Sequence, residues 1–409
     1  MKVLLVGSGG REHALAWKLA RSADLDELHA APGNPGIARL GSCHPVREQD
    51  AESLLGLAHS LDIDLVVVGP EAPLCAGVAD ELRHAGVSVF GPSAAAAQIE
   101  GSKLFGKDVM GAAGVATARI LDEPRAPCVV KLDGLAAGKG VFVCRDELEL
   151  EAALAAARNG DELVVEELLE GREVSVFALS DGANAVALPA AQDFKRIGDG
   201  DTGPNTGGMG AFAPAPGLGP DDLEDILDAV HRPVLAELAA RGAPFVGALY
   251  AGLMLTEDGP RVIEFNCRFG DPETQALVPL LDDNFLQLLA AAAGGGLSDG
   301  AVSTSGEAAV TVVLAAGDYP EGRDAGSPIS GIEEAEADGA LVFHAGTAVR
   351  DGALVTNGGR ILGVTAVGTT VAAARERAYA AADRISFPGV RLRRDVAATA
   401  AGEEARVGS

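Results

Sequence analysis

The chain has 409 residues, 48% of them hydrophobic, and because one hydrophobic core rarely serves such a length we expect two to four domains. Its formal net charge of −27 repels nucleic acid phosphates and anionic membrane surfaces, which argues against both as partners. The five cysteines are scattered without a C-x-x-C pair, a pattern that favours reduced, buried thiols over a disulfide framework or a zinc site.

The first hundred residues alternate short apolar strands with helical patterns. Strands are expected at residues 3–6, 65–68 and 87–90, and the first leads into a helix over 12–21. This alternation predicts a parallel, doubly wound sheet, whose ligands bind beyond the carboxyl ends of its strands. No apolar run reaches the roughly 18 residues of a membrane span, and the first one reads as a buried strand rather than a signal peptide. We therefore expect a cytoplasmic protein.

The middle of the chain shows a mixed pattern. A strand, a glycine-rich loop and a second strand occupy residues 128–144, and further strands are expected at 163–166 and 173–179. An irregular stretch follows over 192–216. Within it, residues 198–210 hold six glycines, too many for a helix or an ordinary strand. Such a loop in a compact enzyme is usually functional.

The last hundred residues are β-rich. Four strands are expected, at residues 309–314, 341–343, 353–356 and 361–366. Asn357-Gly358-Gly359 predicts a hairpin between the last two. One helix is expected at about 371–384, and residues 397–409 read as a flexible tail.

A strand-to-helix turn opens the chain with Gly7-Ser8-Gly9-Gly10-Arg11-Glu12. It departs from a dinucleotide fingerprint because Glu12 replaces the third glycine and no acid follows the second strand. The helix N-terminus can still hold a phosphate, with Arg11 adding a charge-assisted contact. Phosphate or ribose-phosphate binding, a purely structural turn and, least favoured, a dinucleotide site remain open for this turn.

A second glycine-rich loop, residues 134–140, resembles a phosphate-binding P-loop. It differs because Gly140 replaces the metal-binding Ser or Thr and a strand follows where a helix is required. A flexible hairpin with Lys131 at its entry and Lys139 near its tip can instead fold over a triphosphate. The alternative is a pair of solvated lysines beside a tight turn.

The run Arg261-Val262-Ile263-Glu264-Phe265-Asn266 alternates with period two. We therefore expect Glu264 and Asn266 to share one face of a strand, where two oxygen ligands can bridge Mg²⁺ to phosphate oxygens. The run continues to Glu273 and supplies a cation, Arg268, for a transferring phosphoryl group, with Asp271 as an acid able to bind an amine.

Six strings of the sequence together resemble the phosphoribosylamine–glycine ligase family of the ATP-grasp superfamily. They are Val6 to His13, Gly69 to Leu74, Glu100 to Lys103, Lys131 to Gly140, Asp201 to Gly210 and Glu264 to Glu273. The resemblance covers Met1 to about Arg394 in the family's order. It implies a multidomain α/β and α+β fold. Its parts are a doubly wound preATP-grasp domain (1–101), an ATP-grasp domain (102–297, with a mobile lid at about 116–178), a β-rich C-terminal domain (298–396) and the tail.

The resemblance also implies roles for individual residues. ATP would be bound by Lys103, Lys131, Lys139, Glu166, Glu167, Leu168 and Glu173. Mg²⁺ or Mn²⁺ would be bound by Glu264 and Asn266. Catalysis would involve Arg268, Lys195 and Asp271. The substrates would contact Gly9, Gly10, Arg11, Glu12, Asp193, Arg268 and Asp271.

The implied reaction joins glycine to phosphoribosylamine at the expense of ATP through an acyl phosphate, and we expect a monomer. Phosphoryl transfer needs positioning and charge stabilisation rather than a nucleophilic side chain, which fits these residues. Alternatives are another ATP-grasp ligase, a nucleotide-binding regulatory protein without catalysis and, least favoured, an NAD-dependent oxidoreductase. Three features depart from the family pattern. Phe194 stands where histidine is usual, the segment before Lys131 is short, and the strand near 251–254 carries no acid.

Overall fold

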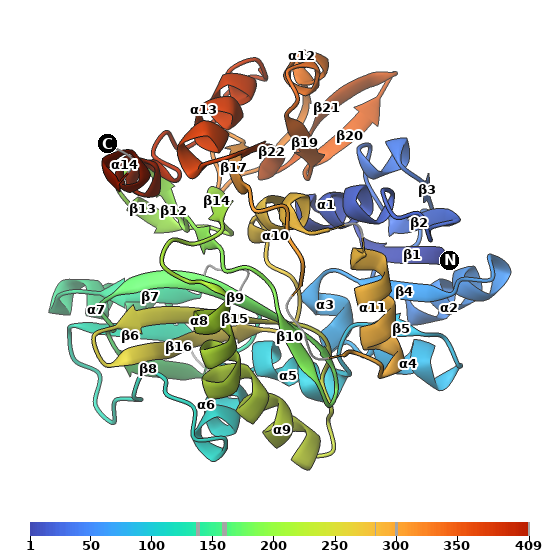
Figure 1. Ribbon diagram of the computed structural model, residues 1–409. Coiled ribbons are helices and arrows are strands. Elements are labelled where there is room, and N and C mark those ends of the chain that lie inside the picture. Colours follow the sequence, from blue (N-terminus) through green and yellow to red (C-terminus); the bar gives the residue numbers. More distant parts are fainter. Residues whose placement is uncertain (136–139, 158–161, 283, 299–301, 408–409) are drawn as a thin grey trace.

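The computed structural model describes residues 1–135, 140–157, 162–282, 284–298 and 302–407. The chain forms an N-terminal α/β part, a central part with two antiparallel sheets, and a strand-rich C-terminal part that lies above the other two in Figure 1. Among the described helices, none is long and apolar enough to cross a bilayer.

The N-terminal part is a five-stranded parallel sheet in the order β3-β2-β1-β4-β5. Its strands are β1 (Lys2–Gly7), β2 (Glu27–Pro32), β3 (Ser42–Cys43), β4 (Leu65–Val68) and β5 (Val89–Phe90). Its helices are α1 (Gly10–Leu19), α2 (Ala51–Ser60), α3 (Glu71–Cys75), α4 (Val78–His84) and α5 (Ala94–Gly101). The residues of β4 are all buried, as expected of a parallel strand covered on both faces. The doubly wound sheet is confirmed.

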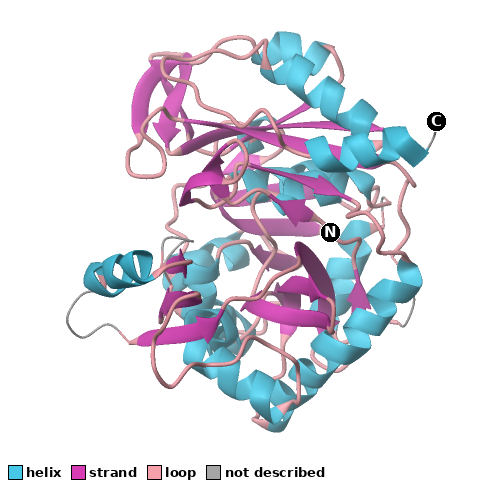
Figure 2. Cartoon of the chain, turned by 90° about the vertical axis from the view of Figure 1, so that its left-hand side faces the viewer, coloured by secondary structure: helices cyan, strands magenta, loops and turns pink. Residues whose placement is uncertain are grey.

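A small antiparallel sheet in the order β7-β6-β8 carries the lysine-containing loop. It consists of β6 (Cys128–Leu132), β7 (Val141–Cys144) and β8 (Leu163–Glu167), with α7 (Glu147–Ala156) packed against it. These elements share their own apolar cluster, which includes Leu150 and Val165. Figure 2 shows α7 at the left edge of the molecule, beside this sheet.

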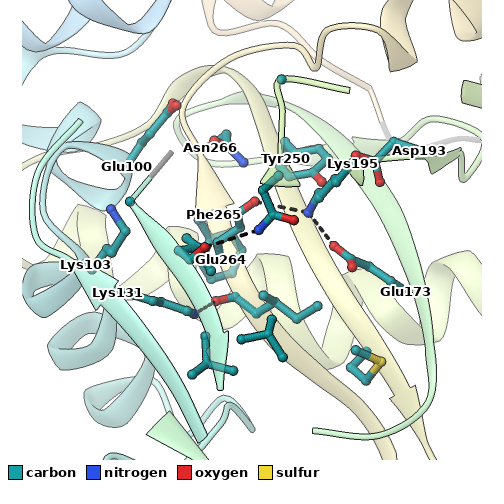
Figure 3. A pocket seen from close by; sticks show the side chains of 18 of the residues that line it. Glu100, Lys103, Lys131, Glu173, Asp193, Lys195, Tyr250, Glu264, Phe265 and Asn266 are labelled. Atoms are coloured by element: carbon teal, nitrogen blue, oxygen red, sulfur yellow. Dashed lines mark hydrogen bonds and ion pairs between the residues drawn. The ribbon is translucent and has the colours of Figure 1, made fainter. Parts of the chain in front are cut away.

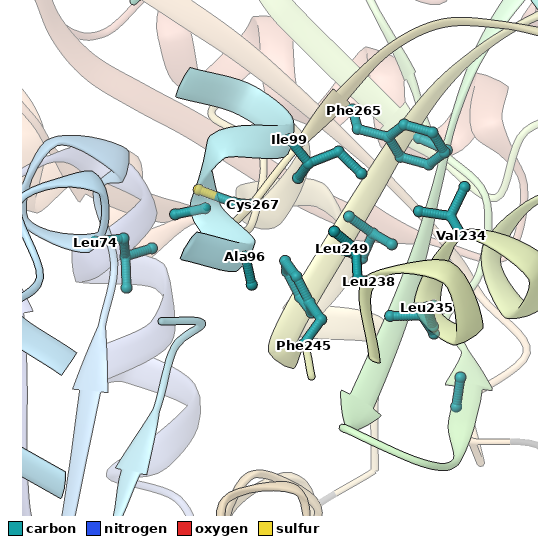
Figure 4. Packing of buried hydrophobic residues seen from close by; sticks show 14 of the residues in the cluster. Leu74, Ala96, Ile99, Val234, Leu235, Leu238, Phe245, Leu249, Phe265 and Cys267 are labelled. Atoms are coloured by element: carbon teal, nitrogen blue, oxygen red, sulfur yellow. The ribbon is translucent and has the colours of Figure 1, made fainter. Parts of the chain in front are cut away.

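The larger central sheet is antiparallel in the order β10-β9-β15-β16. Its strands are β9 (Arg172–Asp181), β10 (Ala185–Ala187), β15 (Val246–Thr256) and β16 (Gly259–Asn266). The helices of this region are α6 (Lys103–Ala112), α8 (Pro220–Ile226), a π-helical turn (Leu227–His231), α9 (Arg232–Ala240), α10 (Glu273–Leu277) and α11 (Phe285–Gly294). Figure 4 shows Val234 and Leu238 of α9 packing toward Phe245, Leu249 and Phe265, which holds the outer face of this sheet in a shared core.

The C-terminal sheet takes two strands from the central part of the chain. Its order is β11-β14-β17-β22-β19, where the strands are β11 (Gln192–Asp193), β14 (Gly210–Ala213), β17 (Ala308–Ala315), β19 (Leu341–His344) and β22 (Arg360–Gly368). A second sheet consists of β18 (Asp324–Pro328), β20 (Thr347–Arg350) and β21 (Ala353–Gly358). Helices α12 (Ile332–Ala337) and α13 (Val371–Ala382) pack against this part. Residues 194–209, which include the glycine-rich stretch that begins at Gly198, are thus held at both ends by strands of the C-terminal sheet.

Two expectations about turns are wrong. Residues 198–210 do contain strand, because β12 (Arg196–Gly198) and β13 (Thr202–Asn205) form a short hairpin. Asn357-Gly358-Gly359 does not form a hairpin, because β21 pairs with β18 and β20 whereas β22 pairs with β17 and β19. A Cβ on Gly358 would lie 2.8 Å from the Cα of Gly346, so these glycines permit the close backbone crossing at which the chain changes sheets.

The expected flexible tail is also wrong for residues 398–407, which form helix α14 (Ala398–Val407) packed on α13. The Glu404 carboxylate accepts hydrogen bonds from the backbone N–H groups of Val371 (3.2 Å) and Ala372 (3.1 Å). It therefore caps the N-terminus of α13, where a negative charge is favourable.

Candidate functional site

A cavity of about 890 Å³ lies where the three parts of the molecule meet. Thirteen of the residues predicted for the site line it: Arg11, Lys103, Lys131, Glu166, Glu167, Leu168, Glu173, Asp193, Lys195, Glu264, Asn266, Arg268 and Asp271. Gly9, Gly10 and Glu12 lie behind Arg11 rather than in the lining, and Lys139 lies outside the described residues. Residues that are up to 260 positions apart in sequence are thus brought to one place.

Two of the predicted lysines lie where the small antiparallel sheet and α6 border the cavity. The Lys131 ammonium lies 2.8 Å from the Glu166 carboxylate and donates to the carbonyl of Ile263 (2.8 Å). The Lys103 ammonium donates to the carbonyl of Gly134 at 2.8 Å, and burial lowers its pKa. Lys131 therefore faces the cavity from β6, at the entry to the glycine-rich loop, and Lys103 faces it from the start of α6 (Figure 3).

Glu166 and Glu167 are the last two residues of β8, the strand of the small sheet that leads to the larger one. The side chain of Glu166 is buried between Lys131 and Lys107, whose ammonium lies 3.0 Å from it. The Glu167 carboxylate instead accepts from the backbone N–H of Arg119 at 3.0 Å. The Glu166 carboxylate is therefore already paired with two lysines rather than free in the cavity wall.

Glu264 and Asn266 lie on β16 and project into the cavity, as alternation predicted (Figure 3). Burial works against the charged form of Glu264, but the positive charges of Lys195 and Lys131 outweigh it and lower the pKa of that carboxyl. Lys195 lies 3.5 Å from Glu264 and also pairs with Glu173. An ionised carboxylate and an amide oxygen on one strand form a donor set suited to a hard divalent cation.

Arg268 follows this strand and is held by two carboxylates from the N-terminal part. Its Nε lies 3.1 Å from Glu71 and its Nη2 lies 2.9 Å from Glu100. Burial opposes its charge, but Glu100 and Glu71 outweigh that effect and raise the pKa of the guanidinium. The arginine is therefore a fixed cation at the cavity wall.

Asp271 is fixed from the opposite side by the C-terminal part. Arg360 of β22 places Nη2 3.0 Å from its carboxylate and donates through Nη1 to its backbone carbonyl at 2.7 Å. The same Nη1 donates to the carbonyl of Gly207 at 2.5 Å. Gln275 donates to the Asp271 carboxylate at 2.7 Å. Burial disfavours the ionised form, yet Arg360 and Arg11 lower the pKa of Asp271.

The glycine turn at the start of α1 is filled by a side chain of its own helix. The Glu12 carboxylate accepts from the backbone N–H of Gly9 (2.7 Å) and pairs with Nε of Arg11 (2.5 Å). It packs so closely against Gly7 and Gly69 that a Cβ on Gly69 would lie 2.1 Å from it. These glycines therefore make room for a carboxylate at the position where a dinucleotide fingerprint would place a phosphate.

Two acids and a tyrosine, Asp193, Glu273 and Tyr250, lie in another part of the cavity wall. Burial raises the pKa of Asp193 well above its usual range, and it also raises the pKa values of Glu273 and Tyr250. Ser175 places its hydroxyl 3.2 Å from Glu273 and 3.1 Å from the Tyr250 hydroxyl. Burial thus disfavours the charged form of all three groups on this side of the cavity.

Sequence reasoning missed five residues that fix the predicted ones. They are Glu71, Glu100, Lys107, Gln275 and Arg360. Lys107 lies one turn after Lys103 on α6, so helical spacing could have found it. Arg360 carries no local signal, because it reaches the site only through the packing of the C-terminal sheet.

Three family models match consecutive parts of the chain. They describe phosphoribosylglycinamide synthetase: its N domain matches residues 1–100, its ATP-grasp (A) domain matches 101–274 and its C domain matches 309–399. The matches together cover well over half of the chain.

Curated proteins and solved structures give the same result over the full length. A phosphoribosylamine–glycine ligase of Streptomyces coelicolor is 51% identical over 98% of this chain and 100% of its own, and one of Mesorhizobium japonicum is 49% identical over 99% of each. The crystal structure of a phosphoribosylamine–glycine ligase from Thermotoga maritima superposes with a TM-score of 0.83 at 35% identity, over 97% of this chain and 100% of that one. A biotin carboxylase domain from Hydrogenobacter thermophilus, 19% identical with a TM-score of 0.67, shares the fold over 96% of this chain and 91% of its own.

Proposed function

The chain belongs to the phosphoribosylglycinamide synthetase family, and on this premise we propose how its cavity carries out the ligation of glycine to phosphoribosylamine. The enzyme is an ATP-dependent carbon–nitrogen ligase of purine biosynthesis, and its products are glycinamide ribonucleotide, ADP and phosphate. The observation that carries the assignment of roles is the ionised Glu264, which faces the cavity opposite Lys103, Lys131 and Arg268.

ATP lies between the small sheet and the larger one in this proposal. Lys103 and Lys131 contact its phosphates, and the backbone at Glu166, Glu167 and Leu168 forms the hinge around adenine and ribose. Lys139 and Glu173 complete the nucleotide site. Because both ammonium groups already face the cavity, phosphate charges replace their present partners, the Glu166 carboxylate for Lys131 and the Gly134 carbonyl for Lys103.

Glu264 and Asn266 would hold Mg²⁺ or Mn²⁺ in the loaded enzyme. The donor set fits, since the carboxyl is kept ionised by its neighbours and both groups are oxygen donors that face the cavity. A bound divalent cation would neutralise phosphate charge. Lys195 lies beside this pair, so it would exchange its contact with Glu264 for one with phosphate.

The chemistry then proceeds in two displacements. A carboxylate oxygen of glycine attacks the γ-phosphorus of ATP, and ADP leaves, which gives glycyl phosphate. The neutral amine of phosphoribosylamine attacks the glycyl carbonyl, phosphate leaves and the amine gives up one proton. Arg268 stabilises the transferring phosphoryl group, and Asp271 and Asp193 bind the glycine ammonium group. The lid excludes water from the acyl phosphate.

Phosphoribosylamine binds at the N-terminal turn, through Gly9, Gly10, Arg11 and Glu12. The backbone N–H of Gly9 already donates a hydrogen bond to the Glu12 carboxylate, so it is not available to a phosphate. A phosphate contact would therefore come from the Arg11 guanidinium, which lines the cavity, rather than from that amide.

The test is ADP release from ATP with each substrate supplied or omitted. We expect full turnover only with glycine and phosphoribosylamine together. Bicarbonate, the substrate class suggested by the biotin carboxylase fold, should not replace glycine. Equal rates with bicarbonate or with another amino acid would overturn the assignment.

We also propose that the protein is a cytoplasmic monomer with domain limits near residues 101 and 297. Light scattering at micromolar concentration should give one chain mass of 41.3 kDa. A stable mass of twice that value would contradict the monomer.

A further inference from the structure

The Glu166 carboxylate on β8 lies between two buried ammonium groups. Its Oε2 atom is 2.8 Å from Nζ of Lys131 on β6, and its Oε1 atom is 3.0 Å from Nζ of Lys107 on α6. The side chains of Glu166, Lys131 and Lys107 are 2%, 5% and 9% exposed. One buried anion is therefore shared by two cations from different elements, and the proposed reaction gives a role to Lys131 alone.

Lys107 is fixed on the protein side of this cluster. Besides the Glu166 carboxylate, its ammonium group contacts two further oxygen atoms: it donates to the hydroxyl of Thr117 at 2.8 Å and to the carbonyl of Ala118 at 2.5 Å. An ammonium group has three N–H donors, and three protein oxygens thus already surround this one. Burial lowers the pKa of Lys107, and the Glu166 carboxylate opposes that change. Lys107 is therefore placed to hold Glu166 rather than to follow a ligand.

Lys131 faces the cavity beside Lys103 (Figure 3). Its ammonium group is shared between Glu166 and the carbonyl of Ile263, each at 2.8 Å. In the proposed function it exchanges the Glu166 carboxylate for ATP phosphate. A buried carboxylate that loses its partner is strongly destabilised. Because Lys107 stays 3.0 Å from Glu166, the exchange leaves that carboxylate paired.

We propose that Lys107 is a positioning residue for ATP, because it remains the counter-ion of Glu166 when Lys131 turns to the phosphates. The inference deepens the proposed function and rests on the phosphate contact assigned there to Lys131. Without the Lys107 charge, Lys131 would be the partner on which Glu166 depends. ATP would then have to break a buried ion pair and leave a carboxylate unpaired, so phosphate binding would be opposed.

Loss of the Lys107 charge should therefore weaken ATP binding without changing the chemical step. Lys107→Met removes the charge and keeps a side chain of similar length. We expect the Kd of the nonhydrolysable analogue AMP-PNP to rise about ten- to hundredfold, the factor that corresponds to one hydrogen bond to a charged group. KM for ATP should rise by a similar factor while kcat at saturating ATP changes little, because binding lost equally in the ground and transition states leaves kcat unchanged.

A double-mutant cycle with Glu166→Gln tests whether Lys107 acts through Glu166. Gln keeps the shape of the side chain but removes the charge that holds Lys131. In this background Lys107→Met should change the Kd of AMP-PNP by less than about threefold, since coupled residues lose their effect when the partner is removed. A Lys107 that acts only through its contacts to Thr117 and Ala118 would instead have the same effect in both backgrounds.

The experiment measures the binding of AMP-PNP with Mg²⁺ and of adenosine by calorimetry, on the full-length wild type, both single variants and the double variant. Adenosine has no phosphate, so Lys107→Met should bind it like the wild type. Lys2→Met is the matched control, because Lys2 lies outside the cavity lining and pairs with Glu27 at 3.5 Å. Its affinity for both ligands should not change. If Lys107→Met does not fold, Lys107→Gln replaces it, since the amide can still donate to Ala118.

An unchanged Kd of AMP-PNP in Lys107→Met would overturn the proposal. So would an equal loss for adenosine, or the same loss in both backgrounds of the cycle. Failure of the proposed nucleotide role is a separate result, since Lys131→Met would then bind AMP-PNP as tightly as the wild type. Weak binding by Lys131→Met together with normal binding by Lys107→Met would leave the nucleotide site standing and remove Lys107 from it.

Discussion

The guanidinium of Arg393 stacks on the ring of Phe194, with its Cζ atom 4.9 Å from the ring centroid. Arg393 is 1% exposed and also binds Asp395 (2.7 Å) and Asp201 (2.8 Å). Asp395 in turn accepts from the backbone N–H of Gly200 at 2.8 Å. The segment Arg393–Asp395 therefore holds the β12–β13 hairpin in place, and Phe194 is part of that connection.

This stacking predicts that Phe194→Leu lowers the free energy of unfolding by about 0.5–2 kcal/mol, the range from exposed to desolvated cation–π contacts. Phe194→Tyr keeps the ring and is the matched control, with a much smaller expected change. Urea denaturation of both variants provides the measurement. Equal stability of the Leu and Tyr variants would show that the ring itself contributes nothing beyond its volume.

The environment of Glu264 predicts that Glu264→Ala removes turnover while leaving the fold intact. The side chain is only partly buried in the cavity wall, so its packing contribution is small, whereas a ligand to the divalent cation contributes several kcal/mol of charge stabilisation. We expect at least a hundredfold loss in kcat, which corresponds to about 3 kcal/mol. Glu257→Ala, on the exposed turn before β16, is the control and should keep wild-type turnover. Near-normal activity of the Glu264 variant at ordinary Mg²⁺ would exclude the metal role.

Because Arg11 and Glu12 form a buried ion pair, we expect Arg11→Gln to reduce stability as well as substrate binding. Both side chains are less than 10% exposed, and Arg11 also donates to the carbonyl of Phe269 at 3.1 Å. Removal of one partner leaves a buried charge unpaired, which typically costs about 3–5 kcal/mol. We therefore expect a lower melting temperature together with weaker phosphoribosylamine binding.

The double variant Arg11→Gln with Glu12→Gln separates these two effects. It removes both charges, so it should recover much of the stability while still binding phosphoribosylamine weakly. Steady-state kinetics with each substrate varied would be compared for the single and double variants. An unchanged KM for phosphoribosylamine in the double variant would assign Arg11 to folding alone.

Two buried histidines at the contact between α1 and β19 predict a loss of stability in acid. The backbone N–H of His344 donates to Nδ1 of His13 at 2.7 Å, and burial lowers the pKa of His344 to about 4 and that of His13 well below its usual range. Arg39, which pairs with Glu336 nearby, also disfavours both imidazolium forms.

Acid lowers the free energy of unfolding because the unfolded chain takes up a proton on His344 at a higher pH than the folded protein does. The unfolded chain protonates His344 near pH 6.5, the folded one only near pH 4, so stability is present above pH 6.5 and is lost as the pH falls toward 4. Between pH 6.5 and 5 this histidine alone should contribute a loss of about 2 kcal/mol. His344→Gln should show a correspondingly flatter dependence of the free energy of unfolding on pH. Parallel curves for the two proteins would contradict the assignment.

The sequence alone determined the elements whose signal is local. The alternation of β16 placed Glu264 and Asn266 on the cavity side, and the unbroken apolar runs of β1 and β4 identified the parallel sheet. The position of Lys131 at the entry to the glycine-rich loop was also readable from the sequence, whereas Lys103 was assigned only through the family resemblance. These features depend on neighbours within a few residues, so no knowledge of the fold was needed.

Only the tertiary structure decided which distant groups orient the predicted ones. Arg268 is fixed by Glu71 and Glu100, and Asp271 by Arg360, across separations of about 90 to 200 residues. The same holds for the failed hairpin at Gly358 and for the tail that became α14, since each depends on another strand or helix packing against it. The reason is physical: ion pairs and packed helices are stabilised by contacts between segments, and a sequence pattern records a segment's own periodicity but not its eventual neighbours.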